Sequence, residues 1–116
     1  MSKEKHLELG KQLIGDIRDT FARGDWDGTT RTYEQIAGMK TERAVRLEAT
    51  CLAVRALAAA KQRSAARHLL KGIAKNDYKR AAHYEFLARA HLDLKQYKGA
   101  AEACERAEEL RLAELK

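Results

Sequence analysis

Three arginines recur at nearly regular intervals along this chain of 116 residues: Arg18, Arg55 and Arg89. They are separated by 37 and 34 residues. The planar guanidinium group of arginine suits bidentate capture of carboxylates, including the carboxyl end of a peptide. A row of such groups along one surface, with Lys11 beside it, would bind an acidic ligand.

The same arginines also have a simpler interpretation as part of a solvated helix face. Glu85 and Asp93 stand four residues before and after Arg89, so either carboxylate can pair with it along one helix. The sequence leaves both interpretations open.

Residues that could support catalysis or bind a metal are not grouped. His83 and His91 share a predicted helix, but two turns place them roughly 12 Å apart along its axis, too far for one metal ion. Cys51 and Cys104 lie inside helical patterns and form no CxxC motif, so we expect small buried thiols in a reducing compartment. No glycine-rich phosphate loop is present. We therefore expect no catalytic residue, no metal site and no cofactor.

The composition indicates a single all-α domain. Residues of hydrophobic type make up 45% of the chain and charged residues 34%, and proline is absent. Alanine, leucine, lysine, arginine and glutamate dominate, and all of them favour helices. The apolar periodicity predicts six helices in three antiparallel pairs, which span about residues 4–38, 41–74 and 78–114.

The corners inside the three pairs share a register. Trp26, Arg63 and Tyr97 occupy equivalent points, again 37 and 34 residues apart. A period in this range is typical of stacked helix-pair solenoids. At the first corner, "GDWDG", we expect Gly24 to adopt the left-handed conformation and Trp26 to cover the crossing of the two helices.

The last pair has the most regular pattern, which extends through Tyr84, Leu87, Ala88, His91, Tyr97, Ala100, Cys104 and Ala107. This pattern of small residues around a corner aromatic resembles the tetratricopeptide repeat, and the resemblance extends over roughly residues 10–114. Three features depart from it: no unit ends in proline, Asp16 and Ile17 replace a leucine and a small residue, and Arg63 replaces the corner aromatic. The resemblance implies a right-handed α-α superhelix and a non-catalytic role as an adaptor, chaperone or assembly protein.

In that family the first helices of the pairs line a concave groove that holds a segment of another protein. The residues expected to line this groove here are Lys11, Arg18, Phe21, Arg55, Arg89 and Leu92. Phe21 and Leu92 have the alternative of packing between adjacent first helices.

The net charge of +6 and the sequence pI of about 9.5 favour an acidic partner. A runner-up function is docking on nucleic acid through an outer stripe of Arg63, Arg67 and Lys71, although no aromatic residues interleave with it. A further alternative is self-assembly, with a homodimer through the C-terminal helix, because no later helix would cover Leu110, Leu112 and Leu115. These leucines could instead pack back on the fifth helix or bury against a different partner. The N-terminus is charged where a signal peptide is apolar, and no segment is long enough to span a bilayer, so we expect a cytoplasmic protein without membrane insertion.

Overall fold

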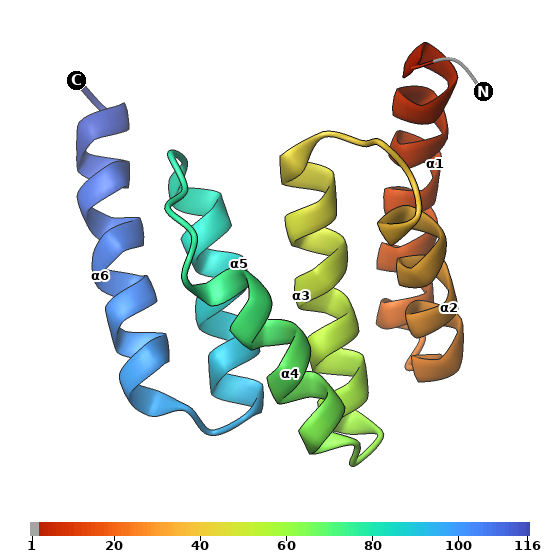
Figure 1. The fold of residues 1–116 in the computed structure, drawn as a ribbon. Coiled ribbons are helices and arrows are strands. Elements are labelled where there is room, and N and C mark those ends of the chain that lie inside the picture. The colour runs from red at the N-terminus through yellow and green to blue at the C-terminus, as the bar shows by residue number, and fades with distance from the viewer. Residues whose placement is uncertain (1–2) are drawn as a thin grey trace.

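The computed structural model describes residues 3–116, which form six α-helices and no strand (Figure 1). The helices are α1 (Lys3–Ala22), α2 (Trp26–Ala37), α3 (Arg43–Ala59), α4 (Arg63–Ala74), α5 (Ala81–Asp93) and α6 (Tyr97–Glu114). We call α1, α3 and α5 the first helices of their pairs, and α2, α4 and α6 the second helices. The prediction of an all-helical chain is confirmed. None of these helices is long and apolar enough to cross a membrane.

The three corners have the same backbone geometry. Trp26, Arg63 and Tyr97, which we expected at equivalent points of the three corners, are the first residues of the three second helices. Two residues earlier, each corner has a residue with positive φ: Gly24 at 74°, Lys61 at 64° and Lys95 at 60°. The left-handed turn therefore recurs at all three corners, although only the first has the glycine that adopts it without strain.

Side-chain packing differs between the corners. At the first corner, the Asp25 carboxylate caps α2 by accepting the Gly28 N–H at 2.9 Å, and the Trp26 ring lies 5.4 Å from the Phe21 ring between centroids. At the third corner the Tyr97 side chain is 66% exposed. The corner aromatic therefore contributes to packing in the first pair and projects into solvent in the last.

The start of α5 differs from the sequence prediction. We expected this helix to begin at Tyr78, but it begins at Ala81. Tyr78 is instead a buried residue of the α4–α5 loop, where its hydroxyl donates to the Ile73 carbonyl at 2.8 Å. Its backbone N–H donates to the Tyr84 hydroxyl at 2.9 Å, which ties the loop to α5. These two hydrogen bonds, to residues five and six positions away in the sequence, hold Tyr78 in place outside the helix.

Helix α3 is the centre of the packing, because it contacts α1, α2, α4 and α5. The smaller core lies between α1, α2 and α3 around Ile17 and Ile36, which are fully buried. The larger core lies between α3 and the helices that follow it, around Val54, Leu70 and Leu87. Within residues 3–116, α6 contacts no helix other than α5, so it forms one edge of the molecule (Figure 1).

Candidate functional site

Two of the three recurrent arginines tie successive first helices together. Arg18 of α1 forms a bidentate ion pair with Glu48 of α3, with Nε–Oε2 and Nη2–Oε1 distances of 2.5 and 2.6 Å. This hydrogen-bonded pairing raises the pKa of Arg18 above its ordinary value. Arg55 of α3 pairs with Asp93 of α5 at 2.8 Å. Both guanidinium groups therefore have a carboxylate partner within the chain.

Phe21 belongs to the same network. The Arg55 guanidinium lies 4.7 Å from the centroid of the Phe21 ring, the distance of a cation–π contact. Phe21 is half-buried between this arginine and Trp26, so it packs between α1 and α3. A ligand that used Arg55 would have to displace the Asp93 carboxylate or share the guanidinium with it.

Arg89 behaves differently from the other two arginines. The expected partners along its own helix pair elsewhere, because Glu85 binds Arg111 of α6 and Asp93 binds Arg55. Arg89 is exposed and makes no ion pair within residues 3–116. The interpretation that Arg89 is neutralised along α5 is therefore wrong.

The six residues predicted to form one groove are divided among three places. Arg18, Phe21 and Arg55 form the contacts between α1, α3 and α5 described above. Arg89 and Leu92 line a separate groove between α5 and α6. Lys11 is exposed on α1.

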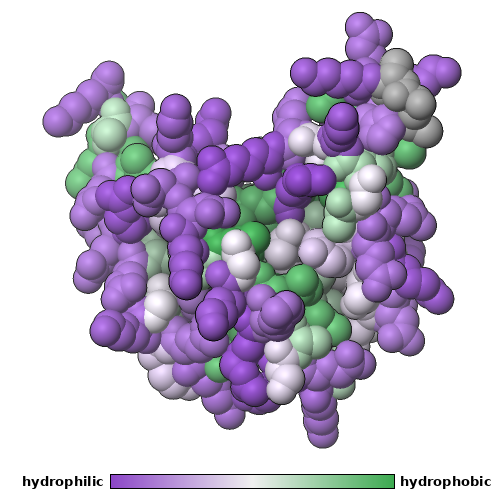
Figure 2. Space-filling model, viewed as in Figure 1, coloured by the Kyte–Doolittle hydropathy of each residue, from purple (hydrophilic) through white to green (hydrophobic). Residues whose placement is uncertain are grey.

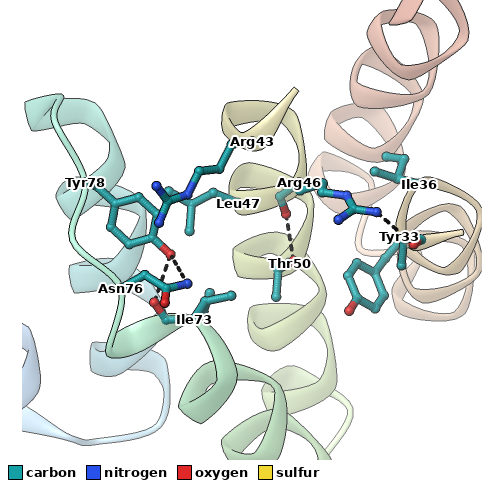
Figure 3. A pocket seen from close by; sticks show the side chains of 10 residues that line it. Tyr33, Ile36, Arg43, Arg46, Leu47, Thr50, Ile73, Asn76 and Tyr78 are labelled. Atoms are coloured by element: carbon teal, nitrogen blue, oxygen red, sulfur yellow. Dashed lines mark hydrogen bonds between the residues drawn. The ribbon is translucent and has the colours of Figure 1, made fainter. Parts of the chain in front are cut away.

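The sequence did not predict a groove that lies on α3 between α2 and α4, which we call the α3 groove. Helices α2 and α4 both pack on α3 but do not contact each other within the described chain. They leave a cavity of about 330 Å³ lined by Tyr33, Ile36, Ala37, Arg43, Arg46, Leu47, Thr50, Ile73, Asn76 and Tyr78 (Figure 3). Figure 2 shows hydrophobic residues at the bottom of a hollow near the centre of this face, with hydrophilic side chains around it.

The polar walls of the α3 groove are held by contacts to the backbone and to one another. Arg46 donates to the Met39 carbonyl at 2.7 Å, which fixes the chain after α2. The Arg43 guanidinium lies 4.8 Å from the centroid of the Tyr78 ring. Burial raises the pKa of Tyr78 above its ordinary value, so its phenol remains a neutral hydrogen-bonding group.

The composition of the α3 groove suits a ligand with both apolar and acidic groups. Ile36 and Leu47 are buried beneath the groove, whereas Ile73 is partly exposed there, and the Tyr33 ring extends from α2 toward the space over α3 (Figure 3). Arg43 makes no ion pair within residues 3–116, so its charge is available to a carboxylate. The signal in the sequence was the placement of Arg43, Arg46 and Thr50 on one side of a helix, but the residues opposite them come from α2 and the α4–α5 loop.

The two cysteines differ in environment. Cys51 is 2% exposed, and burial raises the pKa of its thiol to about 12. Cys104 is exposed, so the expectation that both thiols are buried is wrong for this residue. Its helical periodicity is that of a core position, but within residues 3–116 α6 packs on α5 alone and no further helix covers this side of it.

The two cysteines should differ in reactivity. At pH 8, with the protein at low concentration, we expect a chromogenic disulfide reagent to modify one thiol per native chain rapidly. Only the thiolate reacts, and a thiol with a pKa of about 12 is ionised in roughly one molecule in ten thousand at this pH. The Cys104→Ser variant should lose the fast reaction, and denaturant should release the slow one. Two fast thiols in the native wild type would contradict the burial of Cys51.

The histidines provide no metal site within residues 3–116, where no group of three or more His, Cys, Asp or Glu side chains could hold a metal ion. His91 is half-buried and its Nδ1 lies 2.8 Å from Oε1 of Gln96. His83 packs edge-on to Tyr78, and burial, followed by the nearby charges of Arg80 and Arg43, lowers its pKa. A neutral His83 therefore belongs to the packing around the α4–α5 loop.

The remaining predicted surfaces are exposed. Arg63, Arg67 and Lys71 lie on the exposed face of α4, where Arg67 donates to the Ser64 hydroxyl at 3.4 Å. Of the C-terminal leucines, Leu110 packs against the larger core, whereas Leu112 and Leu115 are 58% and 80% exposed.

No protein-family model, curated protein sequence or solved structure matches this chain.

Proposed function

We propose that this chain is a non-catalytic protein-interaction module that binds an acidic segment of another protein, in the manner of an adaptor, chaperone or assembly factor. Its net charge of +6 attracts acidic partners over a distance of several ångströms. We propose further that its three helix pairs stack as a right-handed superhelix like that of tetratricopeptide repeats. The recurrence of the left-handed corner residue and the side-by-side packing of α1, α3 and α5 support this arrangement.

The observation that carries the proposal is the chemistry of the α3 groove. Its cavity of about 330 Å³ is large enough for one or two ligand side chains. An apolar side chain would lie on Tyr33 and Ile73, which are partly exposed, and a neighbouring carboxylate would meet the exposed Arg43 guanidinium beside it. Recognition of this kind needs a hydrophobic anchor and an oriented polar group, and the groove has both.

The first-helix face with Arg18 and Arg55 is a less favourable site for the same ligand. Glu48 and Asp93 already neutralise these two arginines, so an incoming carboxylate gains less there. Arg43 has no such competitor among the described residues.

The test is selection of binding peptides from a random library displayed on phage, followed by fluorescence anisotropy with the strongest labelled peptide. We expect the selected peptides to combine a large apolar residue with adjacent carboxylates. Arg43→Glu should weaken binding about tenfold or more, which corresponds to ~1.4 kcal/mol. Tyr33→Ala should also weaken it, without a change of charge. Arg67→Glu makes the same charge change on the exposed face of α4, and it should leave the affinity within about twofold.

Other results would point elsewhere. Loss of peptide binding in Arg18→Glu but not in Arg43→Glu would move the site to the first-helix face. Failure to select any peptide, combined with RNA binding that Arg67→Glu abolishes, would replace the proposal with docking on nucleic acid. Circular dichroism on each variant separates a lost contact from a lost fold.

A further inference from the structure

The outer side of the last helix pair is an uncovered surface with a groove along it. Helix α6 packs on α5 alone, and α5 has its other contacts with α3 and α4. The C-terminal groove, as we call it, has a volume of about 390 Å³. It is lined by Glu85, Ala88, Arg89 and Leu92 of α5 and by Cys104, Ala107, Glu108 and Arg111 of α6.

Exposed apolar side chains are concentrated at this groove. Leu92 at one end of it is 49% exposed. Leu112 and Leu115 follow Glu108 and Arg111 by four residues, so they continue the same side of α6 beyond the groove. Among the large hydrophobic residues that the described chain exposes, only Tyr97 does not belong to this surface. Such a concentration indicates a surface that another molecule covers.

Two charged side chains of the groove have no ion-pair partner within residues 3–116. Glu85 and Arg111 pair across it, which leaves Arg89 and Glu108 as an exposed cation and an exposed anion without an ion pair within residues 3–116. Arg18 and Arg55 stand at the equivalent positions of α1 and α3, and each pairs with a carboxylate on the next first helix. Within residues 3–116 no further first helix packs on this side of α5, so Arg89 has no carboxylate of an adjacent first helix to pair with.

A second copy of this chain supplies both missing partners. The Glu85–Arg111 pair sets the register of the antiparallel helices α5 and α6, so Arg89 lies level with Ala107 and Glu108, and Leu92 lies level with Cys104. A twofold axis parallel to these helices places α5 of one copy opposite α6 of the other. Arg89 of each copy then faces Glu108 of the other copy, and the same contact forms twice.

We propose that the C-terminal groove is the interface of a symmetric homodimer, held by two reciprocal Arg89–Glu108 ion pairs and by burial of Leu92, Leu112 and Leu115. A head-to-tail arrangement fits less well, because the exposed side of α1 is charged and polar and offers no apolar stripe. The dimer leaves the α3 groove free, so this inference does not depend on the proposed function.

The experiment is sedimentation equilibrium of the full chain under reducing conditions, over about 1–100 µM. We expect the mass of the wild type to rise with concentration from 13.1 kDa toward twice that value. Arg89→Glu and Glu108→Arg should each raise the dimer dissociation constant at least about tenfold, because each reversal puts two pairs of like charges in contact. An equimolar mixture of the two variants should recover the dimer, since every contact in the mixed dimer is again between a glutamate and an arginine.

Arg67→Glu is the matched control, because it makes the same change of charge outside the groove and should dimerise like the wild type. A second measurement is the labelling rate of Cys104, which lines the groove. Labelling should slow as the concentration of wild type rises, but not in Arg89→Glu. A wild type that stays monomeric throughout, or a dimer that neither reversal weakens, would overturn the proposal, and a monomer would leave the groove to a different protein.

Discussion

Replacing Leu87 by alanine is expected to lower the free energy of unfolding by about 2–5 kcal/mol. Leu87 is 2% exposed and lies in the larger core, where α5 meets α3 and α6. Its truncation removes apolar contacts and leaves a cavity that the surrounding helices fill only in part. Because single domains are stabilised by only about 5–15 kcal/mol, this loss is a large fraction of the total.

The measurement is urea unfolding followed by circular dichroism at 222 nm. Tyr97→Ala is the control, because it also removes a large side chain from the last pair, but from a position that is 66% exposed. We expect this variant to stay within about 0.5 kcal/mol of the wild type. A larger loss for Tyr97→Ala than for Leu87→Ala would mean that the corner aromatic packs as in the repeat family, against the exposure described above.

Replacing Tyr78 by alanine is expected to cost about 3–5 kcal/mol, the range for truncating a buried aromatic side chain. Its ring packs edge-on to Tyr84 at 5.7 Å and under the Arg43 guanidinium, and its hydroxyl holds the last turn of α4 through the Ile73 carbonyl. Tyr78 is buried, whereas the other residues of the α4–α5 loop, 75–77 and 79–80, are exposed.

A more conservative variant tests the hydrogen bond that joins the loop to α5. Tyr84→Phe removes only the hydroxyl that accepts the Tyr78 N–H, and we expect it to cost about 1–3 kcal/mol, because a buried donor is left without a partner. Tyr33→Phe makes the same chemical change in the α3 groove and should cost less than about 0.5 kcal/mol. Urea unfolding of the three variants beside the wild type provides the comparison, and equal effects of Tyr84→Phe and Tyr33→Phe would contradict this role of Tyr84.

The six helices and their corners could be predicted closely because both depend on local signals. The apolar period of each helix and the polar corner clusters are readable from neighbouring residues, and the second helices begin at Trp26, Arg63 and Tyr97, the residues expected at the corners. The exception is Tyr78, which the sequence pattern placed in the helix, whereas the structure buries its ring in the larger core beside Arg43 and binds it to Ile73 and Tyr84.

The candidate sites were much less predictable, because the periodicity of a helix indicates which side a residue occupies but not which neighbour meets it. Arg18, Arg55 and Arg89 have equivalent positions in the sequence, yet within residues 3–116 only the first two find carboxylates, since only α1 and α3 have a further first helix packed beside them in that range. Cys104 has a core-like position, but it is exposed for the same reason.

The sequence by itself determined that this protein is all-helical, that its helices form three pairs, and where each pair turns. These properties follow from interactions between residues close together in the chain. Only the tertiary structure decided which arginines are neutralised, that α2 and α4 stand apart over α3, and that the last pair leaves an apolar groove with one free cation and one free anion among the described residues. Those properties depend on how helices far apart in the sequence cross and which helix faces another one covers, and no local pattern encodes either.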